Sequence, residues 1–209
     1  HGFLFGDSVY EVVCTINNQP CFLEKHLCRL FASAKAISLD IPHDKQWFHE
    51  QLKATLQAAN NTESYIRIIV TRGVGEVNID PSTCHKPNII IIVMETKEYP
   101  ESCYEKGIHV ALVSIKRNSR DALNPNVKTG NYLNNVLAKV ESNKLGAQDA
   151  IMVNSSGHLT EGTTSNLFFV RDGHIFTPSL DCGLLSGITR EMIIQLSKEN
   201  GFRVEEGRW

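Results

Sequence analysis

The residues best suited to chemistry in this 209-residue sequence lie in three short stretches, the first of which surrounds Lys128. Lys128 follows the Asn124-Pro125 dipeptide, which favours extended backbone, and precedes a helical pattern that ends at Gly146. The apolar residues of that pattern are Tyr132, Leu133, Val136, Leu137 and Val140. A lysine between a strand and a helix can point its amine into a cleft, although a lone lysine is most often solvated.

The second stretch places a carboxylate beside small hydroxyl residues, in Glu161-Gly162-Thr163-Thr164-Ser165-Asn166. The third, Leu185 to Arg190, is a small, hydroxyl-rich turn that opens a helix. The first backbone N–H groups of a helix and the positive end of its dipole attract anions such as phosphate. Taken singly, the second stretch could equally be a solvated turn and the third an ordinary helix cap.

An amine, a carboxylate and an anion site are what pyridoxal 5′-phosphate (PLP) requires from a protein. The aldehyde of PLP forms a Schiff base with a lysine, and its ring nitrogen needs a carboxylate that keeps it protonated. Its phosphate binds a helix N-terminus and an arginine. The three stretches together therefore indicate PLP chemistry more strongly than any one of them alone.

Composition and charge narrow the class of protein. The sequence has 42% hydrophobic residues, 21% charged residues and a net charge of -2, typical of a soluble protein without nucleic acid or membrane as partner. No apolar run approaches the ~20 residues that cross a bilayer. The six cysteines and eight histidines are scattered, so we predict reduced thiols, no metal and a cytoplasmic location.

The first half of the chain has the pattern of an α+β domain. Its predicted elements are a hairpin of residues 9–16 and 19–23 around Asn17-Asn18, helices over residues 24–38 and 44–59, and strands over residues 64–71 and 88–94. Arg29 lies outside the apolar stripe of the first helix, and Arg67 shares a strand face with Tyr65 and Ile69. Each arginine would ordinarily face water, unless it binds an anion.

A polar, proline-containing segment divides the chain into two predicted domains. The first covers residues 1–97, the linker 98–106, and the second domain 107–209. In the second domain we predict strands over residues 107–115, 149–153 and within 159–170, a hairpin at Asp172-Gly173, and a helix from Ile188 that Gly201 ends.

The chain resembles the class IV (fold-type IV) PLP-dependent aminotransferases, a family of branched-chain aminotransferases, D-amino acid aminotransferases and 4-amino-4-deoxychorismate lyases. The matching blocks occur in family order over nearly the whole chain and read FGDSVYEVV, EKHLCRLFASA, YIRIIVTRG, VKTGNYLNNVLAKVE, LTEGTTSNLFFV and LSGITREMI. The resemblance implies a two-domain α+β fold like that of D-amino acid aminotransferase, with the cofactor at the domain interface. It also implies a homodimer whose partner loop completes the pocket.

Matching the blocks residue by residue implies a role for each candidate. Lys128 resembles the lysine that forms the Schiff base and moves the proton on the substrate Cα. Glu161 resembles the carboxylate on the pyridine nitrogen, and Arg29 resembles the arginine on the phosphate. Further cofactor contacts are implied for Tyr132, Ser165, Asn166, Gly187, Ile188 and Thr189. Tyr10 and Arg67 resemble substrate-pocket positions.

The sequence departs from the family pattern at several places. Ser8 stands where the FGDG pattern has glycine, close to the expected pocket. Tyr132 follows the lysine at a shorter spacing than in some branched-chain members. The family normally has a strand before FGD and further residues beyond the equivalent of Glu206, which supply a hydroxyl contact to the phosphate. We therefore expect this chain to be a trimmed version of a longer protein.

The motifs fit several activities of the family. We predict amino-group transfer between a branched-chain L-amino acid and a 2-oxo acid, because YIRIIVTRG and KTGNYLNNVLAKVE are most similar to prokaryotic branched-chain members. One alternative is a D-amino acid aminotransferase, although no Arg-x-His pair follows Thr71-Arg72-Gly73. Another is a lyase that releases pyruvate and p-aminobenzoate with the same lysine. A non-catalytic PLP-binding homologue is disfavoured, because it need not keep Lys128, Glu161 and Arg29.

Overall fold

The computed structural model describes the whole chain from His1 to Trp209. Contacts between residues divide the chain into two compact units. Unit 1 comprises His1–Glu98 and Val127–Asn131, and unit 2 comprises Tyr99–Asn126 and Tyr132–Trp209. Residues 127–131 therefore belong to unit 1, although the predicted division placed them in the second domain.

Unit 1 is built on an antiparallel four-stranded sheet in the order β2-β1-β3-β4. Its strands are β1 (Ser8–Ile16), β2 (Gln19–Pro20), β3 (Ser64–Thr71) and β4 (Asn88–Glu95). The predicted hairpin is confirmed, because Asn17 and Asn18 adopt φ angles of 51° and 61°, which suit a tight two-residue turn. β2 is shorter than predicted, since Phe22 at φ 52° turns the chain into the next helix.

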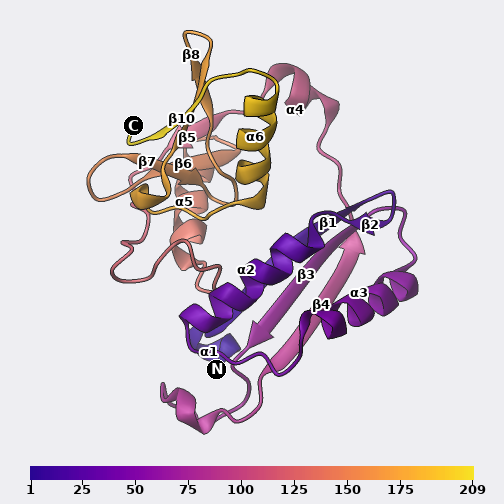
Figure 1. The fold of residues 1–209 in the computed structure, drawn as a ribbon. Coiled ribbons are helices and arrows are strands. Elements are labelled where there is room, and N and C mark those ends of the chain that lie inside the picture. The colour runs from indigo at the N-terminus through magenta and orange to yellow at the C-terminus, as the bar shows by residue number, and fades with distance from the viewer. The chain divides into compact units, whose positions relative to one another are not determined.

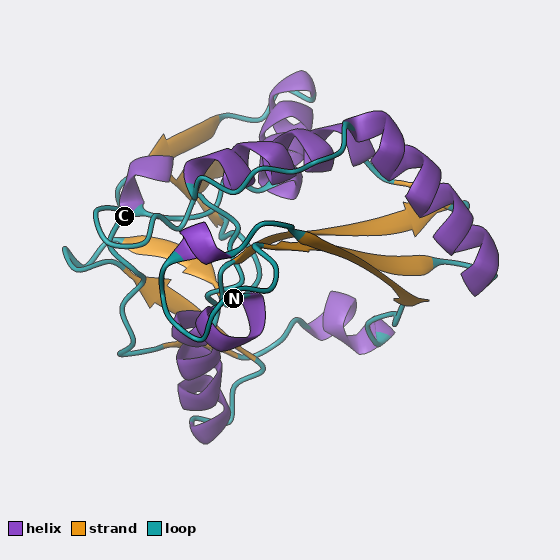
Figure 2. Ribbon diagram, turned by 90° about the horizontal axis from the view of Figure 1, so that it is seen from below, coloured by secondary structure: helices purple, strands orange, loops and turns teal.

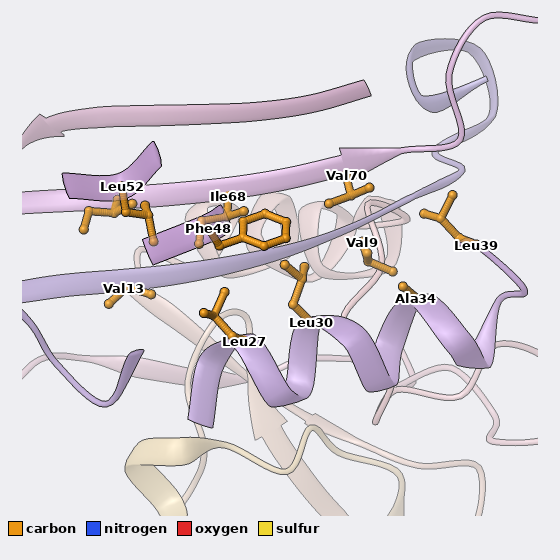
Figure 3. Close-up of a cluster of buried hydrophobic side chains, with 11 residues drawn as sticks. Val9, Val13, Leu27, Leu30, Ala34, Leu39, Phe48, Leu52, Ile68 and Val70 are labelled. Carbon is orange, nitrogen blue, oxygen red and sulfur yellow. The ribbon is translucent and has the colours of Figure 1, made fainter. Parts of the chain in front are cut away.

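Two helices cover one face of this sheet (Figure 1). They are α2 (Leu23–Ala36) and α3 (Lys45–Ala59), and a short α1 (Gly2–Phe5) precedes the sheet. Asp44 caps α3 as predicted, accepting a hydrogen bond from the Trp47 backbone N–H at 2.9 Å. Figure 3 shows the core between helices and sheet, whose labelled members are Val9, Val13, Leu27, Leu30, Ala34, Leu39, Phe48, Leu52, Ile68 and Val70.

The opposite face of the sheet carries the polar candidates. In β3, residues 64, 66, 68 and 70 are buried against the helices, whereas Tyr65, Arg67 and Ile69 share the other face, as predicted. That second face continues onto β4, where Ile90, Ile92 and Met94 are 39%, 38% and 51% exposed. The sheet thus has one covered apolar face and one partly exposed face with Arg67 on it.

Residues 127–131 pair with the start of β1. Thr129 forms an antiparallel bridge with Val9, and the Gly130 N–H donates to the Ser8 carbonyl at 2.8 Å. A Cβ on Gly130 would lie 2.2 Å from the Ser8 hydroxyl oxygen, so this position has no room for a side chain. The pairing fixes the backbone of Lys128 directly beside Tyr10.

Unit 2 contains two three-stranded sheets in the orders β5-β6-β7 and β10-β9-β8. Their shorter strands and the long strands of unit 1 are coloured orange in Figure 2. The elements of unit 2 are α4 (Glu101–Lys106), β5 (Val110–Leu112), α5 (Leu133–Lys144), β6 (Asp149–Val153), β7 (Leu159–Gly162), β8 (Phe169–Arg171), β9 (His174–Pro178), α6 (Ile188–Glu199) and β10 (Val204–Gly207). Single 3-10 turns occur at Pro81–Thr83 in unit 1 and at Leu180–Cys182 in unit 2. None of the helices is both long enough and apolar enough to cross a membrane.

Unit 2 also departs from the expected elements. Helix α4 lies in the segment expected to be a linker, β5 is shorter than predicted, and β10 was not predicted. Helix α5 is confirmed, but its apolar pattern is not its buried face: Leu133 and Val136 are 68% and 51% exposed. Instead the helix packs through small residues, because Ala138 is buried in a cluster with alanines of β5 and β6.

Replacement of Phe48 by alanine should lower the free energy of unfolding by about 3–5 kcal/mol, because it empties a fully buried position of the unit 1 core. The matched control is Phe3→Ala, since that side chain is 99% exposed, and it should change stability by less than about 0.5 kcal/mol. Urea unfolding of both variants measures the difference. Equal losses would contradict the assignment of the core.

Candidate active site

Lys128, Tyr10 and Arg67 meet in unit 1. The Lys128 Nζ lies 4.5 Å from the centre of the Tyr10 ring, and the Arg67 Cζ lies 4.3 Å from the same centre. The backbone N–H of Lys128 donates to the Ser33 hydroxyl of α2 at 3.2 Å, and its carbonyl accepts from the Tyr10 N–H at 3.1 Å. The lysine is therefore held by backbone contacts on both sides, with its amine over an aromatic ring that stabilises cations.

One nitrogen of the Arg67 guanidinium lacks a hydrogen-bond acceptor. Its Nε is buried and has no hydrogen-bond partner. Its direct neighbours in the sheet, Val12 on β1 and Ile92 on β4, are apolar and offer no acceptor in their side chains. Because a buried donor without a partner costs roughly 1–3 kcal/mol, this position favours an anionic group supplied from outside the chain.

Arg29, predicted to bind phosphate, is oriented by the carboxylate of Glu11, which was not among the predicted residues. Its Nε and Nη2 donate to the two oxygens of Glu11, each at 2.7 Å. His26 Nδ1 lies 2.7 Å from one of these oxygens, and the Glu11 side chain is fully buried. Arg29 is thus no solvated helix residue, because the forked pair fixes the direction of its guanidinium.

The charge state of Glu11 follows from competing effects. Burial by itself would raise the pKa of Glu11, but the hydrogen bonds and charges of Arg29 and His26 outweigh it and lower the pKa. Glu11 is therefore an anion inside unit 1. The position of Glu11 in the strand could have revealed this burial. Glu11 shares the covered face of β1 with the core residues Val9 and Val13, two positions to either side.

In unit 2, Glu161 ends up buried beside an arginine. The Glu161 side chain, on β7, is 7% exposed, and its Oε1 accepts from the Arg117 Nε at 2.9 Å. Its Oε2 accepts from the Leu185 backbone N–H at 3.0 Å. Arg117 was not among the predicted residues, because it lies in a polar run that has the composition of a solvated loop.

The turn after Glu161 packs against the start of α6. Asn166 forms an isolated antiparallel β-bridge with Glu161 through the backbone. Its side-chain Nδ2 donates to the Leu185 carbonyl at 3.0 Å. A Cβ on Gly187 would lie 1.8 Å from the Asn166 Oδ1, so only glycine allows this approach. Ser165 closes the turn through its carbonyl, which accepts from the Gly162 N–H at 2.7 Å. The second and third predicted stretches are therefore brought together.

The N-terminus of α6 has the character of an anion site. Gly187 is its N-cap residue and has no side chain to cap the first N–H groups, and Ile188 and Thr189 form the first turn. Tyr132 is likewise the N-cap residue of α5. Within unit 2, a buried carboxylate held by donors and a helix start without a side-chain cap suit the ring nitrogen and the phosphate of PLP.

The predicted residues are distributed over both units. Unit 1 holds Lys128, Arg29, Tyr10 and Arg67. Unit 2 holds Tyr132, Glu161, Ser165, Asn166, Gly187, Ile188 and Thr189. Within each unit the residues assemble as described, and their individual roles toward a cofactor or substrate stay predictions.

Comparison with known proteins identifies the family of this chain. The family described as "Amino-transferase class IV" matches residues 8–208. A Methanocaldococcus jannaschii protein named "Putative branched-chain-amino-acid aminotransferase" is 40% identical over 99% of this chain and 70% of its own length. The aminodeoxychorismate lyase of Bacillus subtilis is 29% identical over 100% of this chain and 71% of its own length.

A solved structure shows the same fold. The branched-chain aminotransferase from Thermoproteus uzoniensis, solved with norvaline, has a TM-score of 0.92 and 29% identity, covering 99% of this chain and 70% of that one. The chain therefore belongs to the class IV aminotransferases, a family of PLP-dependent enzymes, and has the fold of their branched-chain members.

The lowered pKa of Glu11 predicts a pH-dependent contribution to stability. Because the folded pKa lies below the unfolded one, the contribution is present above the ordinary glutamate pKa of about 4.3 and is lost as pH falls through the folded value. Glu11→Gln should therefore destabilise the protein near pH 7 by about 3 kcal/mol, since it removes the buried carboxylate that Arg29 and His26 contact. The deficit should shrink in acid.

Glu24→Gln is the matched control. Glu24 also contacts a histidine and a lysine, but its side chain is 62% exposed, so its loss should cost much less stability than the loss of Glu11. Urea midpoints measured between about pH 3 and 8 compare the two variants. A Glu11→Gln deficit that stays constant down to the lowest pH would contradict the ionised pair.

Proposed function

We propose that this protein is a PLP-dependent aminotransferase that moves the amino group of a branched-chain L-amino acid to a 2-oxo acid. The observation that carries the proposal is the arrangement of Lys128 and Arg67 on the Tyr10 ring, with a buried Arg67 nitrogen that has no partner. The Lys128 amine, which can form a covalent bond, and the Arg67 cation, which favours an anionic partner, contact the same ring. This arrangement suits a substrate with a carboxylate. Membership of the family supports the PLP and Schiff-base chemistry.

The cofactor would be held by groups of this chain. PLP, when bound, withdraws electrons from the substrate Cα and so makes its proton acidic. Lys128 would hold the aldehyde carbon before the substrate binds and, once released as a neutral amine, would move that proton. Glu161 would accept from the ring nitrogen, and Arg29 and the first turn of α6 would bind the phosphate. Tyr132, Ser165 and Asn166 complete the set of proposed cofactor contacts.

The preference for an aliphatic substrate follows from the sheet face around Arg67. Arg67 pairs across the sheet with Val12 and Ile92, and Ile69 follows it on the same face of β3. This surface suits an aliphatic side chain better than a charged one. The 40% identity to the Methanocaldococcus jannaschii protein supports the same choice.

A lyase is the second candidate function. The 29% identity to the Bacillus subtilis aminodeoxychorismate lyase favours it, because that likeness covers 100% of this chain. A lyase would use the same lysine to release pyruvate, so the residues of the candidate site fit both reactions. A D-amino acid substrate, a homodimer, a cytoplasmic location and a cofactor at the domain interface stay predictions from the sequence.

Steady-state assays with single amino donors distinguish these functions. The purified protein with PLP should convert L-leucine in the presence of a 2-oxo acid faster than D-alanine or L-glutamate. Release of p-aminobenzoate from aminodeoxychorismate without an acceptor would instead establish the lyase. Preference for D-alanine would identify a D-amino acid aminotransferase.

Substitution of Lys128 by alanine should lower turnover by at least ~10³-fold, because it removes both the covalent attachment and the proton carrier. Reduction with sodium borohydride followed by mass spectrometry should fix the cofactor on the wild-type peptide and leave the variant unmodified. Lys198→Ala, which changes an exposed lysine of α6, should behave as wild type. Full turnover of the Lys128 variant would remove Lys128 from the mechanism.

Substitution of Arg67 by glutamine should raise the KM for the amino acid by about 10–100-fold, the value of a hydrogen bond to a charged group. The turnover number should fall less, because the cation contacts substrate and not the reacting atoms. Arg67→Lys retains the charge and should recover part of the affinity. An unchanged KM in both variants would show that the substrate carboxylate binds elsewhere.

A further inference from the structure

Arg117 is fixed in unit 2 by more contacts than its place in a polar loop predicts. The segment continues beyond β5 alongside β6, since the Arg117 N–H donates to the Val153 carbonyl at 2.9 Å. Its side chain is only 8% exposed and donates from Nε to the Glu161 Oε1. The backbone and the head of this arginine are therefore both anchored.

The first turn of α5 holds the other side of the guanidinium. The Asn134 Oδ1 accepts from the Arg117 Nη1 at 3.0 Å, while its Nδ2 donates to the Lys116 carbonyl at 2.8 Å. The next residue, Asn135, is buried and donates to the Thr163 carbonyl at 2.7 Å. Two successive asparagines thus tie the start of α5 to Arg117 and to the turn that follows Glu161.

These contacts restrict Glu161 at both of its oxygens. One oxygen meets the Arg117 Nε and the other meets the Leu185 N–H at 3.0 Å. A carboxylate with 7% exposure would be unfavourable as an ion without a compensating charge, and Arg117 supplies that charge. The arginine also disfavours a proton on Glu161, because the protonated acid would leave the guanidinium without an anion.

We propose that Arg117 is a positioning residue that keeps Glu161 ionised and aimed for its role toward the cofactor nitrogen. The inference rests on the proposed function and extends it to a residue outside the recognised motifs. A carboxylate paired with a guanidinium is a weak base, so a proton shared with a ring nitrogen stays on the nitrogen. Loss of Arg117 would remove the guanidinium that faces the Glu161 Oε1 and would leave that oxygen less well oriented.

The test is a double-mutant cycle of Arg117→Gln and Glu161→Gln. The first readout is the thermal midpoint of the protein without cofactor, measured from about pH 5 to 8. Arg117→Gln should lower the midpoint, and more at pH 8 than at pH 5, because loss of the guanidinium disfavours the ionised carboxylate more than the protonated one. In the Glu161→Gln background the same change should have little effect.

The second readout is the dissociation constant for PLP, from titration of the cofactor-free protein, together with the turnover number. Arg117→Gln should weaken PLP binding and slow turnover by about 10-fold or more each, as expected for loss of a charged hydrogen bond. Arg117→Lys should recover part of both. In the Glu161→Gln background, Arg117→Gln should change neither by more than about 3-fold.

Arg120→Gln is the matched control, since it neutralises an exposed arginine of the same loop, and it should leave both readouts unchanged. Equal effects of Arg117→Gln in both backgrounds, or none in either, would overturn the positioning role while leaving the proposed function intact. A wild-type protein that binds no PLP would overturn the proposed function and this inference with it.

Discussion

Buried carboxylates can remain ionised only beside a compensating charge, and this constraint shapes both units of the protein. Glu11 is fully buried and contacts Arg29 with both oxygens, and Glu161 is almost as buried beside Arg117. Each arginine gains a fixed direction from the carboxylate that it neutralises. The charged groups proposed to act on a cofactor are therefore rigid because their partners are out of water.

The two pairs differ in how they are built. Glu11 projects from the covered face of β1 onto the helix that follows in the chain, so the pair joins neighbouring elements. In the sequence, Arg117 precedes α5 and Glu161 follows it. The asparagines of that helix contact Arg117 and the turn after Glu161. Local pairing is sufficient in unit 1, whereas unit 2 needs three separate segments to fix one carboxylate.

Much of the fold was predictable because its signals are local. The cap at Asp44, the Asn17-Asn18 turn and the alternation in β3 depend on residues close in sequence, and each was confirmed. Long-range effects were not predictable. Arg117 reaches Glu161 across 44 positions, and α5 packs through Ala138 although its apolar residues suggested another face. The residues of the recognised motifs were therefore found, but the partners that orient them were not.

The discontinuous composition of unit 1 has a consequence for synthesis of the chain on the ribosome. β1 precedes the segment that borders its beginning, Val127–Asn131, which follows only after residues 99–126 have been translated. Until that segment is present, the start of β1 has one strand edge without a partner, and open strand edges are places where other chains can pair. The same backbone pairing covers that part of the edge and sets Lys128 beside Tyr10.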